Sequence, residues 1–542
     1  MALSALTRFW ALGLSGIDQF DEGGYAMSAM AVAAGDLPEG LYPLQHFLSP
    51  PFFFGMSGLL MRLFGTTDLV PVALSATLGV LTVGLVYVFA RRSMDPLSAL
   101  GGAALLALSD YHILYSGAGL TDVAFAFWFL VALVSYAETD ARRSLGWAVV
   151  AGVATGLAWN TKYHGWLAGV IAGVALLPHL WLASWERFRE GFVRLLTAAA
   201  VAVLVYAPWL FWVTRQDGGY ARLAAEHASF LHPLRAPLHA FVHVQHQLHL
   251  DGWLARISPA LALLAISLLM VARPAPGAVA RRVGLLVLAG FVLGGTLTGA
   301  LLALLGLPVA IRSTDPRRWV ALSFLLVFTG LSPLYTPYPR LLLPWVIAVF
   351  VFAGVGLVRV ATATTLRELL PETAWRPTAA VVGALSLLCL VLRPPWLVAS
   401  TYRASDGFEL ATPQIAAMVP TGVATPVLGE PGVAYYLRRM GRESWHVDTP
   451  GQLYGRLSPG DSLYLVGGRY SRLIAGSIGL AGWSNDHPGA VERIGAVSVS
   501  AISDVRLLDD LSHTHARTFT RAPGDEYELV VYRIVLPEQA TP

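Results

Sequence analysis

Long apolar runs dominate the first 392 residues and constrain the fold more than any other feature. Runs such as 69–90 and 341–358 are long enough to cross a bilayer as helices, which takes about 17–25 residues. Only 13% of the 542 residues are charged, well below the roughly 25% that is usual in soluble domains. The sequence therefore predicts an all-α polytopic membrane domain.

Short arginine clusters between the runs set the predicted orientation, because cytoplasmic loops of membrane proteins are enriched in Lys and Arg. With these clusters inside, the chain crosses the cytoplasmic (inner) membrane about thirteen times and its C-terminus lies outside. The run 283–311 has arginines at both ends, so we interpret it as a broken hairpin that bends at Gly294, Gly295 or Gly299. The net charge of +3 then reflects topology and not a nucleic-acid partner.

The pattern changes after residue 392, where the long apolar runs stop. Short strand-like stretches at 423–428, 462–466 and 528–535 alternate with a helix-like segment at 433–440. This alternation predicts a transmembrane domain over 1–392 and a small extracytoplasmic α/β domain over 393–542. The single cysteine, Cys389, excludes an intramolecular disulfide.

Acidic and basic side chains gather in the turns that this topology places outside. Asp21 and Glu22 follow the first apolar run, which we interpret as a membrane anchor, and lie in the loop after it. The other outer turns contribute His46, His112, Asp122, Lys162, Tyr338 and Arg340. A carboxylate that accepts a proton from a hydroxyl, with cations that hold a leaving phosphate, is what group transfer from a phosphate-activated donor requires.

Several of these motifs resemble those of one enzyme superfamily. Asp21-Glu22-Gly-Gly-Tyr25, with His46 and Pro50-Pro51 after it, resembles the first extracytoplasmic loop of GT-C glycosyltransferases of the protein-O-mannosyltransferase and aminoarabinose-transferase type. Further resemblances follow in chain order at Tyr115-Ser116 with Thr121-Asp122, at Asn160-Thr-Lys162, and at Tyr338-Pro-Arg340-Leu-Leu-Leu-Pro344. The match covers roughly the first 390 residues.

This resemblance implies an enzyme that moves a sugar from a polyprenyl-phosphate carrier to an acceptor hydroxyl outside the cytoplasm, usually with inversion. It makes Asp21 the general base or acceptor-positioning acid, Glu22 its support and Asp122 the second acid. Asp21 and Asp122 are also the candidate ligands of a divalent cation. Substrate and phosphate contacts fall to Tyr25, His46, Lys162, Tyr338 and Arg340, and His112 replaces an arginine that relatives often carry near the position of Gly117.

Simpler interpretations of the same residues stay open. Asp21 and Glu22 can be solvated loop acids, and Asp122 can be a helix N-cap. Lys162 and Arg340 can extend from span ends toward water. Tyr338, with the nearby Tyr335, fits an aromatic belt at the membrane interface.

A histidine-rich loop offers a separate metal hypothesis. His239, His243 and His246 recur at helical spacing, and His249 and Asp251 follow. Two histidines four residues apart on a helix can share a zinc ion. The alternation with apolar residues favours an amphipathic helix on the membrane surface instead.

Two other functional classes compete with the enzyme. A transporter or flippase of lipid-linked saccharides more often carries ionisable groups near the bilayer midplane and inverted repeats. A non-catalytic receptor or scaffold predicts that the membrane acids are dispensable and that the C-terminal domain binds the partner by itself. Neither the sugar nor the acceptor (protein, lipid or glycan) follows from the sequence.

Overall fold

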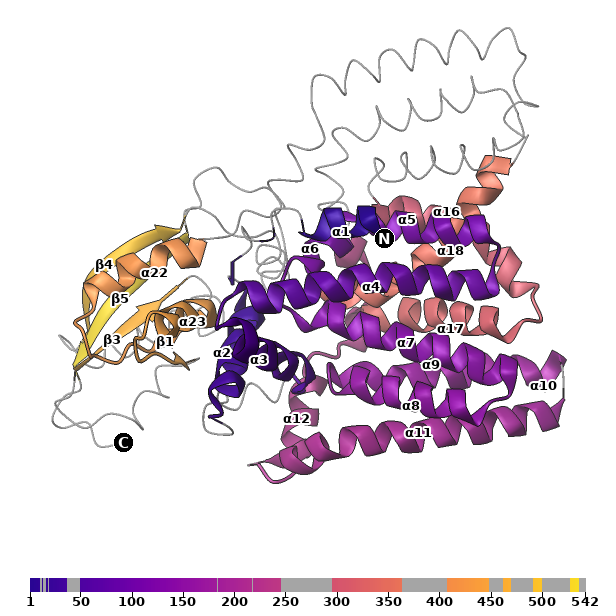
Figure 1. Ribbon diagram of the computed structural model, residues 1–542, viewed down its shortest axis with the longest axis horizontal. Coiled ribbons are helices and arrows are strands. Elements are labelled where there is room, and N and C mark those ends of the chain that lie inside the picture. The colour runs from indigo at the N-terminus through magenta and orange to yellow at the C-terminus, as the bar shows by residue number, and fades with distance from the viewer. Residues whose placement is uncertain are drawn as a thin grey trace, which may run out of the picture.

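A computed structural model of the protein describes residues 1–9, 12, 16–17, 19–36, 49–182, 184–216, 218–244, 295–362, 407–447, 462–468, 491–499 and 527–535. Helices form the part before residue 363, and a sheet with two helices forms the described part from residue 407 onward. Figure 1 shows the long helices running side by side, with the sheet beyond one end of them. The predicted combination of a helical part and a smaller α/β part is confirmed.

The first described helices are α1 (Ala2–Phe9), α2 (Phe20–Ala34), α3 (Phe52–Phe64), α4 (Leu69–Ser93), α5 (Pro96–Ala107), α6 (Asp110–Ser116), α7 (Thr121–Arg142) and α8 (Leu145–Trp159). After them come η3 (Tyr163–Trp166), α9 (Leu167–Leu176), α10 (Pro178–Leu182), α11 (Trp185–Val213), α12 (Gly219–Ala228) and η4 (Pro233–Arg235). The helical part closes with α16 (Gly295–Ile311), α17 (Pro316–Leu331), η5 (Ser332–Leu334), η6 (Pro339–Leu342) and α18 (Leu343–Thr362).

Within the described residues, 5 helical segments are long and apolar enough to cross a membrane: Leu69–Ser93, Thr121–Arg142, Tyr163–Leu182, Trp185–Val213 and Pro339–Arg359. Four shorter apolar helices join them. Local signals mark where helices begin: Asp95 caps α5 and Asp315 caps α17, and each precedes a proline at the start of its helix. A proline there has no amide hydrogen to leave unpaired, so both boundaries follow from the sequence.

The structure corrects two sequence predictions. Asp21 and Glu22 do not lie in a loop, because they occupy the first turn of α2. Gly299 is not a bend, because it lies inside the continuous helix α16, which begins at Gly295. Gly294 and the first half of the predicted hairpin lie outside the described residues.

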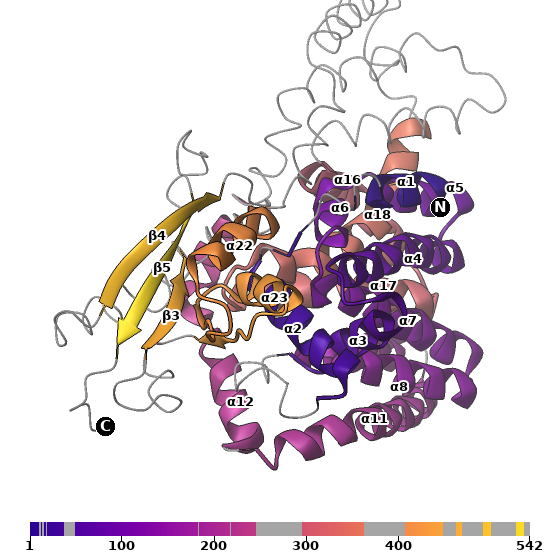
Figure 2. The same ribbon diagram turned by 60° about the vertical axis from the view of Figure 1, so that its left-hand side comes forward.

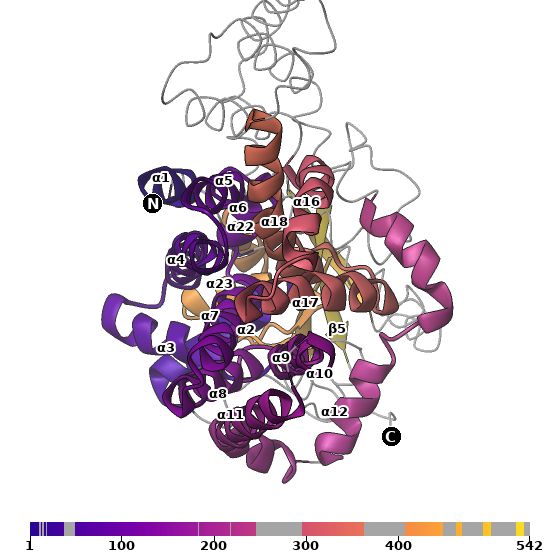
Figure 3. The ribbon, with the colours of Figure 1, turned by 90° about the vertical axis from the view of Figure 1, so that its right-hand side faces the viewer.

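Helices of the bundle approach closely where glycine removes the side chain. A Cβ at Gly354 of α18 would lie 2.1 Å from the Ser98 carbonyl of α5, and one at Gly356 would lie 1.9 Å from the Leu302 carbonyl of α16. Small residues permit such contacts between membrane helices, whose association depends on close packing. Figure 3, which looks nearly along the bundle, shows α7 among α4, α8, α9 and α17, all of which it contacts.

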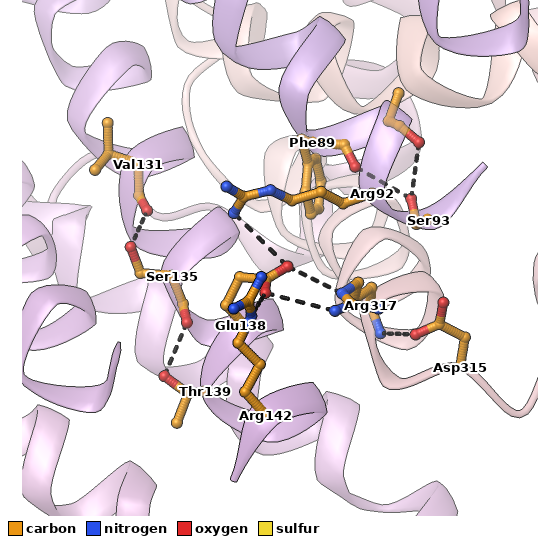
Figure 4. A network of polar contacts seen from close by, with 11 residues as sticks. Phe89, Arg92, Ser93, Val131, Ser135, Glu138, Thr139, Arg142, Asp315 and Arg317 are labelled. Atoms are coloured by element: carbon orange, nitrogen blue, oxygen red, sulfur yellow. Dashed lines mark hydrogen bonds and ion pairs between the residues drawn. The ribbon is translucent and has the colours of Figure 1, made fainter. Parts of the chain in front are cut away.

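A buried carboxylate joins three helices at one end of the bundle. Glu138, near the end of α7, has a side chain that is 1% exposed and accepts from Arg317 of α17 at 2.9 Å. Arg142, one turn further along α7, also pairs with it, and Arg92 of α4 lies 3.6 Å away. Figure 4 shows these arginines surrounding the Glu138 carboxylate. The arginines used to predict the inner ends of the spans therefore meet at one end of the bundle.

Among its described residues, the C-terminal part contains a five-stranded sheet in the order β2-β1-β3-β5-β4. Its elements are α22 (Gly407–Met418), β1 (Val427–Leu428), α23 (Pro431–Arg439), β2 (His446–Val447), β3 (Ser462–Gly467), β4 (Val491–Val499) and β5 (Tyr527–Val535). β1 pairs in parallel with β2 and β3, whereas β5 runs antiparallel to β3 and β4. The predicted strands near 423–428, 462–466 and 528–535 and the helix near 433–440 are confirmed, and β2 and β4 were not predicted.

We expect Glu138→Gln to lower the free energy of unfolding by about 2 kcal/mol, because it leaves several arginines without their shared buried counter-charge. Thermal unfolding in detergent, followed by tryptophan fluorescence, measures this loss. Glu190→Gln is the matched control, since the Glu190 side chain is 37% exposed and its ion pairs with Arg143 and Arg194 are long, at 3.8 and 3.7 Å. Equal unfolding temperatures for the two variants would contradict a structural role of Glu138.

Candidate active site

The first acid pair is held by a capping box at the start of α2. The Gln19 side chain accepts from the amides of Asp21 and Glu22, and Glu22 Oε2 accepts from the Gln19 amide at 3.1 Å. Glu22 Oε1 also accepts from the Gly119 amide at 2.5 Å, just before α7. Reciprocal capping of this kind fixes the first turn of a helix. Glu22 is thus a buried structural residue that ties α2 to the start of α7.

Asp21 points to a different partner. Its Oδ2 lies 2.6 Å from Arg340 Nη2, and the Asp21 side chain is 29% exposed whereas that of Arg340 is 13% exposed. Arg340 comes from η6, between α17 and α18, so the contact joins residues 319 positions apart in the chain. Asp21 is therefore neither a solvated loop acid nor unpaired, and Arg340 does not extend into water.

A second ion pair joins Asp122 and Lys162. Lys162 Nζ donates to Asp122 Oδ1 at 2.6 Å, and the side chains are 13% and 4% exposed. Asp122 lies in the first turn of α7, whose N-cap is Leu120, so the N-cap interpretation of Asp122 is wrong. The second oxygen, Asp122 Oδ2, is buried and has no hydrogen-bond partner among the described residues. That oxygen therefore has unused hydrogen-bond acceptor capacity.

The two ion pairs belong to one electrostatic cluster. Burial lowers the pKa of the Lys162 ammonium, Asp122 and Asp21 oppose this shift, and Arg340 adds to it. Burial raises the pKa of the Tyr25 phenol, as does the negative charge of Asp21, whereas Arg340 lowers it. The structure thus brings together Tyr25, Asp21, Asp122, Lys162 and Arg340, which the sequence predicted as a group.

Aromatic side chains lie beside parts of this cluster. The Arg340 guanidinium lies over the Tyr338 ring, with its central carbon 5.4 Å from the ring centroid. His227 of α12, which is not among the residues of the predicted motifs, packs on Tyr163 with ring centroids 5.0 Å apart. Burial and the nearby Lys162 charge lower the pKa of His227 to about 4, so its imidazole is neutral at physiological pH. His227 lies in the histidine-rich stretch 214–253, but outside the helical spacing of His239, His243 and His246 that singled out those histidines.

His112 lies in another cluster. Its Nδ1 is 2.6 Å from Arg8 Nη2, and its side chain is completely buried. Arg8 also donates to the carbonyls of Leu106 and Ala107 at the end of α5, where the helix dipole favours a cation. Burial lowers the pKa of His112, and Arg8 adds to this shift. The structure thus gives His112 a partner other than Lys162 or Arg340; His46 lies outside the described residues.

The carboxylates do not fit the predicted divalent-cation site. Asp21 and Asp122 each face a basic side chain at 2.6 Å, which supplies the positive charge that a metal ion would bring. Within the described ranges, no group of three or more His, Cys, Asp or Glu side chains is arranged to hold a metal ion. The residues present therefore favour cation roles for Lys162 and Arg340.

The described histidines of the predicted metal loop contact backbone instead. His239 Nδ1 lies 3.1 Å from the carbonyl oxygen of Pro333, in η5. Burial lowers the pKa of His243 to about 4, while a hydrogen bond to the Ser332 backbone opposes this shift. Both residues lie in the helical stretch 236–244. His246, His249 and Asp251 lie outside the described residues.

Comparison with known proteins finds stretches of the chain that are similar to glycosyltransferases. Residues 49–217 match the family model described as dolichyl-phosphate-mannose-protein mannosyltransferase. The chain is 29% identical over 232 residues to undecaprenyl phosphate-alpha-4-amino-4-deoxy-L-arabinose arabinosyl transferase 2 of Pseudomonas fluorescens, a match over 41% of each chain. It is 35% identical over 102 residues to a lipid A galacturonosyltransferase of Rhizobium johnstonii, over 19% of this chain and 20% of that one.

The predicted family resemblance is confirmed. The mannosyltransferase family match covers Asp122 and Lys162 and leaves out Asp21 and Arg340. The chain matches 41% of the length of the arabinosyl transferase. Among solved structures, ArnT from Cupriavidus metallidurans bound to undecaprenyl phosphate has a TM-score of 0.47 at 17% identity, over 100% of this chain and 98% of that one.

We expect Lys162→Met to lower the free energy of unfolding by about 3 kcal/mol, because it leaves the Asp122 carboxylate buried without its cation. Adding Asp122→Asn should recover part of this loss, since the pair is then removed together. Thermal unfolding of the two single variants and the double variant measures the coupling. Arg222→Gln, in the exposed Arg222–Glu226 pair, should cost less than about 1 kcal/mol. Additive losses for Lys162 and Asp122 would contradict the pairing.

Proposed function

We propose that the protein is an integral-membrane glycosyltransferase that moves a sugar from a polyprenyl-phosphate donor to an acceptor hydroxyl, with inversion. The observation that carries this proposal is the convergence of two acid–cation pairs, Asp21–Arg340 and Asp122–Lys162, at one end of the helical bundle. The match to the mannosyltransferase and arabinosyl transferase sequences supports the same reaction class. The lipid A galacturonosyltransferase match favours an envelope lipid or glycan as the first acceptor to test.

The proposed topology follows from the distribution of charge. The bundle carries its arginine-rich network around Glu138 at one end of α7 and the candidate site at the other. With arginines on the cytoplasmic side, the site and the C-terminal domain face outward from the inner membrane. We retain about thirteen spans, over 1–392, and an external domain over 393–542 as parts of this proposal.

The proposed chemistry divides the labour between the two pairs. The bond between the anomeric carbon and the phosphate oxygen of the donor breaks, and the acceptor oxygen forms a new bond to that carbon. A carboxylate accepts the acceptor's proton, and polyprenyl phosphate leaves. Asp21 is the better candidate for this base, since it is the more exposed of the two acids. Lys162 and Arg340 stabilise the negative charge on the departing phosphate.

Asp122 completes this scheme as a second acid. Its paired oxygen holds Lys162 in place, while Oδ2 is left to contact the acceptor or the sugar. Glu22 serves by fixing the turn that presents Asp21, since both of its carboxylate oxygens already accept backbone amides. Tyr25 and Tyr338 pack beside the charged groups and keep bulk water from them. A neutral aromatic lining strengthens every charge interaction inside.

We expect Asp21→Asn and Asp122→Asn each to reduce transfer by at least about a hundredfold, because each removes a carboxylate of the reacting centre. The assay presents purified protein in lipid with a panel of labelled polyprenyl-phosphate sugars, with and without chelator. Asp36→Asn is the matched control, since Asp36 is exposed just beyond the far end of α2. Unchanged transfer in both variants would overturn the proposal. Movement of intact donor across the bilayer without sugar release would favour the flippase instead.

The transfer rate should fall on the alkaline side at a pH below 10.5, the usual pKa of lysine, because burial lowers the pKa of Lys162. Lys162 binds phosphate only while protonated, so its loss of a proton as the pH rises removes that contact. Lys162→Arg keeps its charge and should therefore retain its activity to higher pH. Rate profiles of the two proteins across the alkaline range measure this difference, and coincident alkaline limbs would exclude Lys162 as the titrating group.

A further inference from the structure

The C-terminal domain presents the edge of its sheet to the acidic helix. β1 lies between β2 and β3 and runs parallel to both, so the carboxyl ends of the three strands meet at one edge. In open α/β sheets, the crevice at the carboxyl ends beside such a central strand is where ligands bind. Here the start of α2 contacts the beginning of α23, the helix that follows β1 from this edge. Figures 1 and 2 both show α23, which follows β1, lying against α2, and the two helices are in contact.

Two glycines meet in a close backbone contact between α2 and α23. A Cβ at Gly23 of α2 would lie 2.2 Å from the backbone nitrogen of Gly432, in the first turn of α23. A Cβ at Gly432 would in turn lie 2.6 Å from the carbonyl oxygen of Ile17. No side chain fits at either position unless backbone moves. Gly23 follows directly after Asp21 and Glu22, so this contact lies beside the candidate catalytic turn.

Polar contacts fix the same interface. The Tyr436 hydroxyl of α23 accepts from the Ile17 amide at 2.9 Å and donates to Asp68 Oδ2 at 3.0 Å. Arg439 Nη1 donates to Asp68 Oδ1 at 3.0 Å. One tyrosine thus joins the segment before α2 to the residue before α4. In addition, the β2 residue His446 packs edge-on against Phe20, the first residue of α2, with ring centroids 5.2 Å apart.

An apolar core continues across the interface. One buried cluster contains Ala26 and Met27 of α2, Val70 of α4, and Ile415 and Val433 of the C-terminal domain. Shared burial of this kind is typical of a permanent contact, since exposing these side chains to water is unfavourable. The helix with Asp21 is therefore packed between the bundle and the sheet domain.

We infer that the C-terminal domain is a positioning element of the active site: the carboxyl edge of its parallel strands binds the start of α2 and holds Asp21 and Glu22 in register with Arg340 and the α7 turn. Gly23, Gly432 and Tyr436 are its positioning residues. The part of this inference that concerns turnover rests on the proposed glycosyl transfer. The domain thus binds a segment of its own chain at the position where other open α/β sheets bind a ligand.

The hydroxyl of Tyr436 provides the first test, in the full-length protein in lipid. Tyr436→Phe removes one hydroxyl and should raise hydrogen exchange at the α2 amides about fivefold, the effect of losing a hydrogen bond of about 1 kcal/mol. Tyr435→Phe is the matched control, because the neighbouring Tyr435 hydroxyl is buried and has no hydrogen-bond partner in the described part of the chain. Equal α2 exchange in the two variants would overturn the inference. This measurement stands even if no sugar donor is turned over.

The glycine contact provides the second test. Gly23→Ala should lower kcat about 10- to 100-fold while the KM for the donor changes little, because it displaces the base and leaves the phosphate cations in place. Gly55→Ala, in α3, is the matched control, since a Cβ there meets nothing within 4 Å. Native kcat in Gly23→Ala together with raised α2 exchange would overturn the positioning role. If the unsubstituted protein transfers no sugar, the proposed function is contradicted. The hydrogen-exchange data would still decide whether the C-terminal domain holds α2.

Discussion

The Asp122–Lys162 ion pair is the interaction on which the candidate-site end of the molecule depends. Both side chains are nearly excluded from solvent, so neither charge is tolerable without the other. Asp122 lies in the first turn of α7, where the helix dipole favours an anion, and Lys162 lies in the turn after α8. Their contact therefore fixes the start of α7 relative to the end of α8. The Asp21–Arg340 pair in turn joins α2 to η6.

The two buried carboxylates of α7, Asp122 and Glu138, lie at opposite ends of the helix and have different surroundings. Asp122 begins the helix, whereas Glu138 lies near its end, about 24 Å away along the axis at 1.5 Å per residue. Glu138 forms ion pairs with arginines from three helices, and these pairs hold the helices together. Asp122 keeps one oxygen without a partner among the described residues. The Glu138 carboxylate is thus held by its ion pairs, whereas Asp122 has unused acceptor capacity, which the proposed reaction uses.

Local sequence patterns predicted the parts of the site, and long-range packing decided how they are joined. The helices near Asp122, Lys162 and Arg340 followed from apolar runs and turn residues. The capping box from Gln19 to Glu22 is also a local pattern, so the start of α2 could have been predicted from it. The contact between Gly23 and Gly432 was not, since it joins residues 409 positions apart and no pattern relates them. β4 was not predicted, because a bulge between Arg493 and Gly495 interrupts the alternation of polar and apolar residues along the strand.

The pairing of Asp21 with Arg340 has a consequence for the proposed reaction. Asp21 Oδ2 lies 2.6 Å from Arg340 Nη2, so this oxygen already has a hydrogen-bond donor and is less available to an acceptor hydroxyl. An anionic donor phosphate competes for the same guanidinium, so its arrival weakens the hold on Asp21. The base would then become effective only when the donor is bound, and the acceptor would be deprotonated only where a sugar is ready to receive it. Glu22, held by two backbone amides, cannot follow such a change, and this difference assigns the neighbouring acids to separate roles.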